Sequence, residues 1–171
     1  MDAIVGLGPL RRTEGATVEF AWSGLWGETT AVGLWSIPAD RTVDVDGRMT
    51  SVGDGVLVDG RAAATLDTQC ARCLSVVAYP ATAEFEELFV YPEHAGDYAD
   101  EDVCFIADDQ VDLGPVIHDC LILAQPAIVL CQPDCRGLCP LCGVNLNEQP
   151  DHRHDAGPDE RWQALAALRL D

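Results

Sequence analysis

Apolar and polar residues alternate through much of the first 60 residues, which is the pattern of strands that bury one face. Residues 18–23 alternate Val, Phe and Trp with Glu, Ala and Ser, and residues 43–46 alternate Val with Asp. Gly53-Asp54-Gly55 predicts a turn. Val58-Asp59-Gly60-Arg61 predicts a hairpin, because Asp-Gly tolerates the positive φ angles of a type I′ turn. The first 60 residues are therefore expected to be rich in β-structure.

Two further strands are predicted on either side of the motif Cys70-Ala71-Arg72-Cys73. Residues 62–66 place Ala, Ala and Leu on one face before the motif, and residues 77–85 alternate again after it. The motif is therefore expected at the turn of a hairpin, where a metal ion would pin the hairpin tip.

One helix is expected to form part of the core. Asp112 is typical of an N-cap, and Gln125-Pro126 ends the helix because the residue before proline avoids the helical conformation. Apolar side chains lie on most faces of this segment, which predicts a buried helix. Its main stripe consists of Leu113, Val116, Ile117, Cys120, Leu121 and Ala124.

Three shorter segments complete the pattern. Residues 92–102 are expected to form an acidic loop, and residues 103–106 a short buried strand. Gly157-Pro158 precedes a short terminal helix, which places on one side Trp162, Leu165 and Ala166.

These elements predict an α+β fold: a mostly antiparallel β-sheet or partly open barrel with one buried core helix, a C-terminal zinc-knuckle segment and a short terminal helix. At 171 residues the chain is expected to form a single domain. Residues 1–60 form its β-rich part, residues 61–130 its strands and core helix, and residues 131–171 a zinc-binding appendage.

The candidate chemistry centres on residues 131–143, which hold four of the eight cysteines. Cys139-Pro-Leu-Cys142-Gly143 has the form of a zinc knuckle, a turn in which two thiolates two residues apart bind one metal ion and glycine allows the backbone to curl. A tetrahedral zinc ion needs four ligands, so other parts of the chain must contribute.

The ligands divide evenly into two sets, which favours two structural zinc sites. The first set is Cys70, Cys73, Cys131 and Cys135, and the second is Cys139, Cys142, His152 and His154. The alternative is one all-cysteine site made of Cys70, Cys73, Cys139 and Cys142. Cys104 and Cys120 are left over in apolar runs and are expected to be buried free thiols.

Catalytic uses of these residues fit less well. A zinc deaminase needs Pro-Cys-x-x-Cys with an upstream His-x-Glu, and neither His94 nor His118 is followed by such a glutamate. A redox pair belongs at the start of a helix, whereas Cys70 and Cys73 lie between strands. A catalytic zinc ion also keeps one coordination position open. We therefore expect no enzymatic activity, with thiol redox chemistry as an alternative.

The charge of the chain constrains its partners. The net charge is −19, all ten basic residues are arginine, and none lies between Arg72 and Arg136. Nucleic-acid binding depends on Lys and Arg, so direct contact with RNA is not favoured. A basic protein is the expected partner, although acidity can also serve solubility alone. RNA binding through the knuckles remains an alternative, carried by Arg136, Arg153, Arg161 and Arg169.

The N-terminal residues show no basic segment followed by a long apolar run, so no signal peptide is expected. No run of about 18 apolar residues is present, which predicts no membrane span. Thiols in a cytoplasmic protein favour metal binding over disulfides.

Several of these segments together resemble the YceD family, whose members are described as needed for accumulation of large-subunit ribosomal RNA. The resemblance rests on residues 121–126, Cys131, residues 135–147, residues 70–74 and residues 111–113. It implies a bacterial cytoplasmic protein, or a plastid relative, that acts in synthesis, processing or stability of that RNA. The family's gene commonly neighbours one for a small basic ribosomal protein. Many relatives carry Cys-x-Cys where this chain has His152-Arg-His154.

Overall fold

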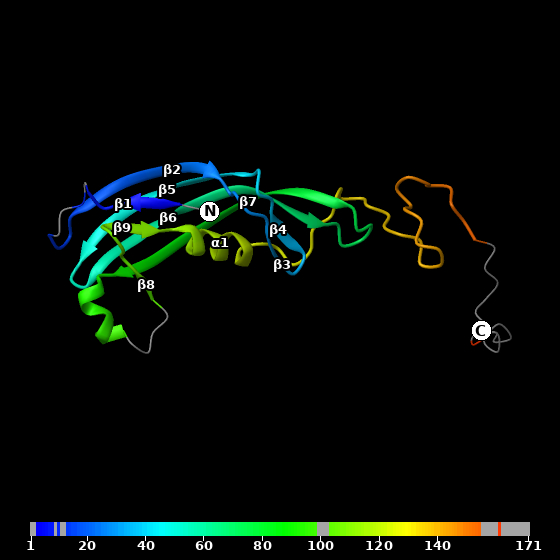
Figure 1. The fold of residues 1–171 in the computed structure, drawn as a ribbon. Coiled ribbons are helices and arrows are strands. Elements are labelled where there is room, and N and C mark those ends of the chain that lie inside the picture. The colour runs from blue at the N-terminus through cyan, green and yellow to red at the C-terminus, as the bar shows by residue number, and fades with distance from the viewer. Residues whose placement is uncertain (1–2, 9, 11–12, 99–102, 155–160, 162–171) are drawn as a thin grey trace, which may run out of the picture.

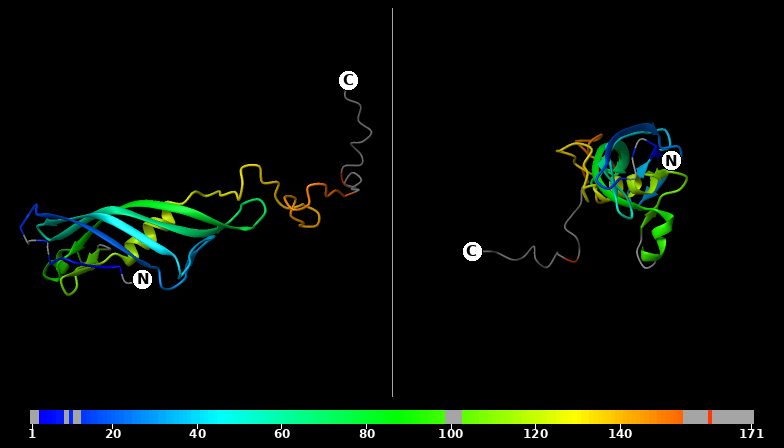
Figure 2. Two further views of the ribbon diagram at one scale, coloured as in Figure 1. Left: turned by 90° about the horizontal axis from the view of Figure 1, so that it is seen from above. Right: turned by 90° about the vertical axis from the view of Figure 1, so that its left-hand side faces the viewer.

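Two long paired strands, β6 (Gly55–Gln69) and β7 (Val76–Val90), form the centre of a curved antiparallel sheet (Figure 1). The structure is a computed structural model that describes residues 3–8, 10, 13–98, 103–154 and 161. β6 and β7 pair over their whole length, from Gly55 opposite Val90 to Gln69 opposite Val76. The hairpin that joins them extends beyond the rest of the sheet (Figure 2).

The other strands attach to this hairpin on both sides. β5 (Thr42–Val52) pairs with the first part of β6, and β2 (Thr17–Leu25) pairs with β5. Further along β6, the short hairpin of β3 (Thr30–Val32) and β4 (Trp35–Ile37) joins through Ser36 opposite Asp67. On the far side, β8 (Cys104–Phe105) runs parallel to the end of β7. Within the described residues β2 and β7 do not pair with each other, so the sheet is open.

The alternation in the sequence explains which face of the sheet is buried. Odd positions of β5 such as Val43, Val45 and Met49, and even positions of β6 such as Val58 and Leu66, are at most 2% exposed. Helix α1 (Gly114–Leu123) and a two-stranded sheet of β1 (Ile4–Gly6) and β9 (Gln110–Asp112) complete the core. The predicted mostly antiparallel sheet with few helices is thereby confirmed.

The hairpin predicted at Asp59-Gly60 is wrong, because both residues lie inside β6. Gly60 pairs directly with Gly47 of β5. A Cβ atom on Gly60 would lie 2.7 Å from the Asp46 carbonyl oxygen and 2.9 Å from the Phe85 ring. Glycine at this position therefore permits close packing within a strand and does not mark a turn. The turn predicted at residues 53–55 is correct, since it joins β5 to β6.

The predicted helix exists and ends before Gln125-Pro126, but only part of it is buried. Ile117 and Leu121 face the core, whereas Leu123 is 82% exposed. The helix lies against the sheet and is not surrounded by it. Leu113, and not Asp112, is the N-cap residue. The Asp112 carboxylate still accepts a hydrogen bond from the Gly114 N–H at 2.9 Å, so it satisfies one donor of the first turn.

Other short segments differ from expectation. Part of the predicted acidic loop forms a 3₁₀ helix, η1 (Pro92–Tyr98). The strand predicted at residues 103–106 is only two residues long, and its Phe105 is exposed. Cys104 and Cys120 are half-buried, not fully buried. The terminal helix predicted around Trp162 lies outside the described residues.

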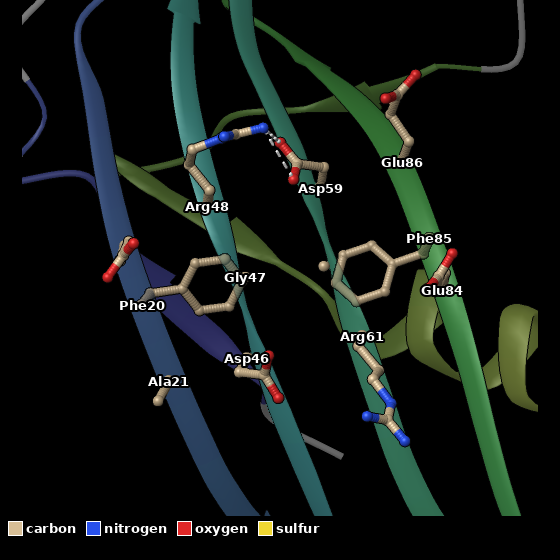
Figure 3. Close-up of a pocket in the computed structure, with 12 residues that line it drawn as sticks. Phe20, Ala21, Asp46, Gly47, Arg48, Asp59, Arg61, Glu84, Phe85 and Glu86 are labelled. Atoms are coloured by element: carbon tan, nitrogen blue, oxygen red, sulfur yellow. Dashed lines mark hydrogen bonds and ion pairs between the residues drawn. The ribbon is translucent and has the colours of Figure 1, made fainter.

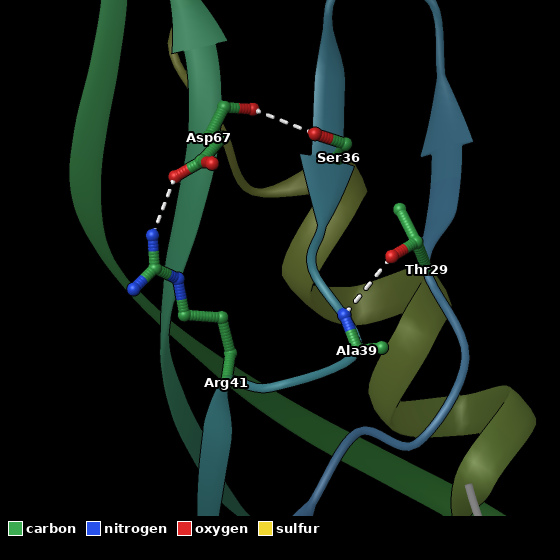
Figure 4. Close-up of polar contacts among 5 residues, drawn as sticks. All are labelled: Thr29, Ser36, Ala39, Arg41 and Asp67. Atoms are coloured by element: carbon green, nitrogen blue, oxygen red, sulfur yellow. Dashed lines mark hydrogen bonds and ion pairs between the residues drawn. The ribbon is translucent and has the colours of Figure 1, made fainter.

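Polar contacts fix the β3–β4 hairpin beside the part of β6 that leads to Cys70 (Figure 4). The Arg41 guanidinium donates to the Asp67 carboxylate at 3.0 Å, and the Ser36 hydroxyl donates to the Asp67 carbonyl at 3.4 Å. The Ala39 N–H donates to the Thr29 hydroxyl at 3.0 Å. These contacts brace the end of β6 immediately before the hairpin tip.

Candidate metal centres

The structure gathers four cysteines at the tip of the β6–β7 hairpin. The sulfur atoms of Cys70, Cys73, Cys131 and Cys135 all lie within 4.8 Å of one another. Two Sγ···Sγ distances are 3.7 Å and 3.6 Å. A tetrahedron with Zn–S bonds of about 2.3 Å has S···S edges of about 3.8 Å, so the spacing fits one metal ion. All four are free thiols, since a disulfide would need about 2.05 Å between sulfurs.

Backbone hydrogen bonds bring the distant parts of this group together. At the tip, the Leu74 N–H donates to the Cys70 carbonyl at 2.9 Å. The Ala71 N–H donates to the Val129 carbonyl at 2.8 Å, and the Leu138 N–H donates to the Arg72 carbonyl at 3.2 Å. The chain that leaves helix α1 is thus bonded to the tip on both sides of Cys131 and Cys135. These contacts explain how cysteines 58 and 65 residues apart meet.

Polar groups around the four sulfurs include Ser75 and Asn147, which are not among the site residues predicted from the sequence. The Ser75 hydroxyl lies 3.0 Å from the Cys73 sulfur, and the Asn147 amide donates to the Cys135 sulfur at 3.3 Å. Ser75 follows Cys73 at the end of the turn, which is the signal that could have identified it. Nothing in the spacing marks Asn147, because it reaches the site from twelve residues beyond Cys135.

Arg72 and Arg136 are sequence neighbours of these cysteines, but their guanidinium groups donate to backbone carbonyls. The Arg72 guanidinium donates to the Cys135 carbonyl at 2.8 Å, while the Arg72 backbone N–H lies 3.5 Å from the Cys70 sulfur. The Arg136 guanidinium donates to the Pro150 carbonyl at 2.9 Å. Backbone amides and uncharged side chains, not guanidinium groups, therefore surround the sulfurs.

These surroundings change the acidity of the thiols. Burial opposes ionisation of Cys70, but backbone N–H groups of Cys73, Cys131 and Arg72 outweigh it and lower the Cys70 pKa from 9.0 to about 6. Hydrogen bonds from Ser75 lower the pKa of Cys73. Cys131 is exposed as a residue, but desolvation of its sulfur among the other cysteines, together with hydrogen bonds to their thiols, raises the pKa of Cys131 to about 12. Metals bind thiolates, so the lowered pKa values of Cys70 and Cys73 favour the form of these residues that a metal ion binds.

A second group lies further along the chain and combines two cysteines with two histidines. Ligand atoms of Cys139, Cys142, His152 and His154 also lie within 4.8 Å of one another. The Cys142 sulfur is 3.2 Å from Nε2 of each histidine, and the two Nε2 atoms are 2.8 Å apart. These distances are a few tenths of an ångström shorter than the edges of about 3.3–3.6 Å in a tetrahedral zinc site with such ligands.

A backbone hydrogen bond closes the turn at Cys139–Cys142, and a glycine with a positive φ follows it. The Gly143 N–H donates to the Cys139 carbonyl at 2.8 Å, and Gly143 has a φ of 75°. The N–H groups of Leu141 and Cys142 point at the Cys139 sulfur and lower the Cys139 pKa to about 6, against the effect of burial. The turn at Cys70–Cys73 repeats these features with Leu74, at a φ of 61°, in the position of Gly143.

In both groups the protein supplies four ligand atoms. Tetrahedral sets of four sulfurs, or of two sulfurs and two nitrogens, suit zinc or an iron–sulfur centre. The alternative of one site joining Cys70 and Cys73 to Cys139 and Cys142 is wrong, because these two pairs belong to separate groups.

The outer face of the sheet is hollowed elsewhere, across β2, β5, β6 and β7 (Figure 3). The hollow measures about 1090 Å³, and its floor is the backbone where Gly47 and Gly60 pair. Arg48 is bonded to Asp59 at 3.0 Å and 3.3 Å. Five carboxylates and two guanidinium groups surround the floor: Glu19, Asp46, Asp59, Glu84, Glu86, Arg48 and Arg61.

The fold and the two ligand groups together define a class of protein. It is an open antiparallel sheet with two candidate metal centres, one of four cysteines and one of two cysteines and two histidines. The family model described as "Large ribosomal RNA subunit accumulation protein YceD" matches residues 58–169. The chain belongs to the YceD family. The matched range includes all eight candidate ligands.

Relatives in two bacterial species match most of the chain. An uncharacterized protein of Mycobacterium tuberculosis is 42% identical over 141 residues, which are 80% of this chain and 68% of that protein. The uncharacterized protein YlbN of Bacillus subtilis is 29% identical over 127 residues, 74% of this chain and 73% of YlbN. No solved structure matches the chain. Among the described residues, no helix has the length and apolar character needed to cross a membrane.

Proposed function

We propose that this protein is a non-enzymatic accessory factor in the accumulation of large-subunit ribosomal RNA, acting in the cytoplasm with two structural zinc ions. One observation carries the proposal: each ligand group brings four protein ligand atoms within 4.8 Å of one another, and the sulfur spacing of the first group fits a tetrahedral site. A catalytic zinc site keeps a position for water or substrate, whereas structural sites are filled by protein. The family description supplies the link to ribosomal RNA.

Zinc is the metal that these ligands favour. Soft thiolates and imidazoles select zinc over magnesium or calcium. In the first site zinc would replace the mutual contacts of four thiols with bonds, and so join the hairpin tip to the chain that follows α1. In the second site the Cys139–Cys142 turn would act as a zinc knuckle, with His152 and His154 completing the set.

The proposed partner is a basic ribosomal protein or an assembly intermediate that contains one. Support comes from the absence of Lys and Arg between residues 73 and 135. Glu84 and Glu86 of that interval project from β7 beside the hollow of the outer face, where carboxylates outnumber guanidinium groups five to two (Figure 3). This face would attract a basic segment most strongly at low salt.

Direct binding of RNA has less support. The Arg72 and Arg136 guanidinium groups, which lie nearest the first ligand group, each donate to a backbone carbonyl of the protein itself. Neither is thereby presented as a free phosphate contact. An RNA-binding surface needs such contacts in number, because affinity for nucleic acid comes largely from cations at the phosphates.

A genetic and a binding experiment test the proposal together. Cells that lack the gene should contain less large-subunit ribosomal RNA, and the wild-type chain should restore it whereas Cys135→Ser should not. At low salt the purified zinc-loaded protein should retain a basic ribosomal protein. Glu84→Arg with Glu86→Arg should weaken that retention more than the control pair Glu28→Arg with Asp40→Arg, which are exposed carboxylates in the connections around β3 and β4.

Three results would contradict the proposal. Normal ribosomal RNA levels in the deletion strain would remove the link to RNA accumulation. Equal retention by both pairs of charge-reversal variants would remove the role of the outer face. Tight binding of a naked ribosomal RNA fragment at physiological salt, without any basic protein, would favour the RNA-binding alternative.

A further inference from the structure

β2 lies at the edge of the sheet. It pairs with β5 along its whole length and, within the described residues, with no other strand (Figure 1). The long strand β7 at the opposite side carries Pro80, Glu84 and Glu86, which discourage pairing along an edge. β2 has no proline and one charged residue, Glu19. It is therefore the less protected of the two edges.

The first hydrogen bond between β5 and the chain that enters β2 shows which β2 residues point their backbone amides toward β5. The Ser51 N–H donates to the Ala16 carbonyl at 2.8 Å, so Ser51 directs its N–H toward β2 and Ala16 directs its C=O toward β5. Hydrogen-bonded pairs recur at every second residue of an antiparallel ladder. Even-numbered residues of β2 therefore bond to β5. The residues that direct their N–H and C=O groups to the free edge are Thr17, Glu19, Ala21, Ser23 and Leu25.

The inward side chains of β2 are incompletely covered. Val18, Phe20 and Trp22 lie on the core face of the sheet, yet each is only half-buried. The corresponding core positions of the next strand, Val45 and Met49, are at most 2% exposed. A further strand beside β2 would cover the three side chains in the way that β2 itself covers those of β5.

We propose that two copies of this chain associate through their β2 strands, antiparallel and in the register that places Ala21 opposite Ala21 of the partner copy. In this register the outward N–H and C=O groups of both strands meet as hydrogen-bonded pairs. Phe20 lies opposite Trp22 of the partner copy in a close non-hydrogen-bonded pair, which brings two aromatic side chains together on the core face. The interface is isologous and closes as a dimer.

Charge supports this register over its neighbours. Glu19 faces Ser23 of the partner copy, and the two copies of Glu19 lie about 14 Å apart along the strands. Centring the pair on Glu19 would set two carboxylates directly opposite each other, which is destabilising. Centring it on Ser23 would leave the first half of β2 unpaired. The β2 sequence is thus complementary to itself in one register, which is why a second copy is the proposed occupant.

Sedimentation of the full-length, zinc-loaded protein over a range of concentrations tests the proposal. The wild-type chain should dimerise, and added salt should strengthen the dimer because each copy carries a charge of −19. Ala21→Glu, which places two carboxylates at the symmetry axis, should raise the dimer Kd about tenfold or more. Ala21→Pro, which removes an outward N–H, should also favour the monomer.

Thr82→Glu is the matched control, since it adds the same charge to an exposed position of β7 and should leave the dimer unchanged. A wild-type chain that stays monomeric up to about 1 mM would overturn the proposal. The proposal would also be overturned if Ala21→Glu and Ala21→Pro dimerised as the wild-type chain does, with circular dichroism showing that both variants are folded. The proposal is independent of docking by a basic protein, which salt weakens, so the two can fail separately.

Discussion

The two ligand groups use the same cysteine turn but join very different lengths of chain. In the first group, ligands 58 and 65 residues apart meet, and three of the four cysteines are buried. In the second group all ligands lie within residues 139–154, and Cys142 and His154 are exposed. A cross-link between distant residues removes more freedom from the unfolded chain than a local one. The first group should therefore stabilise the fold, and the second should order mainly its own segment.

Loss of one ligand should show this difference most strongly. Cys135→Ser, which removes a ligand that is 1% exposed, should lower the free energy of unfolding of the zinc-loaded protein by about 4 kcal/mol. Cys142→Ser should lower it by less than about 1 kcal/mol while also losing one metal ion per chain. Urea unfolding with metal analysis of each variant gives both values. Equal destabilisation by the two variants would remove the distinction.

Loss of the Asn147 side chain should have the next largest effect, because Asn147 lies in the segment of the second ligand group and contacts the first. Its amide nitrogen donates to the Cys135 sulfur, and its amide oxygen accepts from the Arg136 N–H at 2.8 Å. Asn147→Ala should cost about 2 kcal/mol and weaken zinc binding at the first site about tenfold or more. Competition with a zinc-binding dye measures the affinity. Gln149→Ala, an exposed control in the same segment, should have no such effect; a similar loss there would contradict the role of Asn147.

The acidity of the thiols predicts how pH acts on the metal-free protein. The pKa of Cys70 is about 6 in the folded protein, against an ordinary value of 9.0. Between these values the unfolded chain holds a proton that the folded chain has released, so stability rises with pH from about 6 to 9 and is lost as pH falls through 6. The raised pKa of Cys131 changes the pH dependence of stability only above about pH 9. Urea unfolding under reducing conditions should show this slope, and Cys70→Ala should reduce it; a flat or falling profile would contradict it.

The smallest effect concerns the residue that follows each cysteine turn. Leu74 and Gly143 both have positive φ angles, which cost a leucine about 1–2 kcal/mol and a glycine nothing. Leu74 is 57% exposed, so its side chain contributes little packing. Leu74→Gly should raise the free energy of unfolding by about 0.5 kcal/mol. The relief of strain is larger, but the greater entropy of glycine in the unfolded chain offsets part of it. Gly143→Ala should lower the affinity of the second site. If the unfolding temperature of Leu74→Gly were lower than that of the wild-type chain, Leu74 would have contacts that offset its strain.

Much of the sheet could be predicted from the sequence because its residues alternate with a period of two. Residues 18–23 and 77–85 form strands as expected. The helix was found from its apolar spacing, but its exposed side was not, because the spacing cannot show that Leu123 extends beyond the sheet. The turn predicted at Asp59-Gly60 is wrong because the same dipeptide occurs in turns and in closely paired strands. Only the tertiary contact with Gly47 and Phe85 distinguishes these cases.

The ligand groups were predictable in membership but not in their surroundings. Cysteine spacing and ligand count led to the two sets of four that the structure brings together. Asn147 and the backbone bonds from Ala71 to Val129 depend on how the chain returns to the hairpin tip. Such contacts leave no periodic signal, so the sequence could not show them. Proximity in the sequence likewise does not show what an arginine contacts, because the Arg72 and Arg136 guanidinium groups donate to carbonyl oxygens.

The most direct test of the two-site account is native mass spectrometry of the purified chain during titration with a chelator. We expect two zinc ions per chain. The ion of the exposed second site should be lost first, and the ion of the buried first site should be lost later, together with unfolding of the hairpin tip. The same titration of Cys142→Ser should begin at one zinc ion. A single ion in the wild-type chain, an iron–sulfur cluster in its place, or loss of the first-site ion before the other would contradict the account.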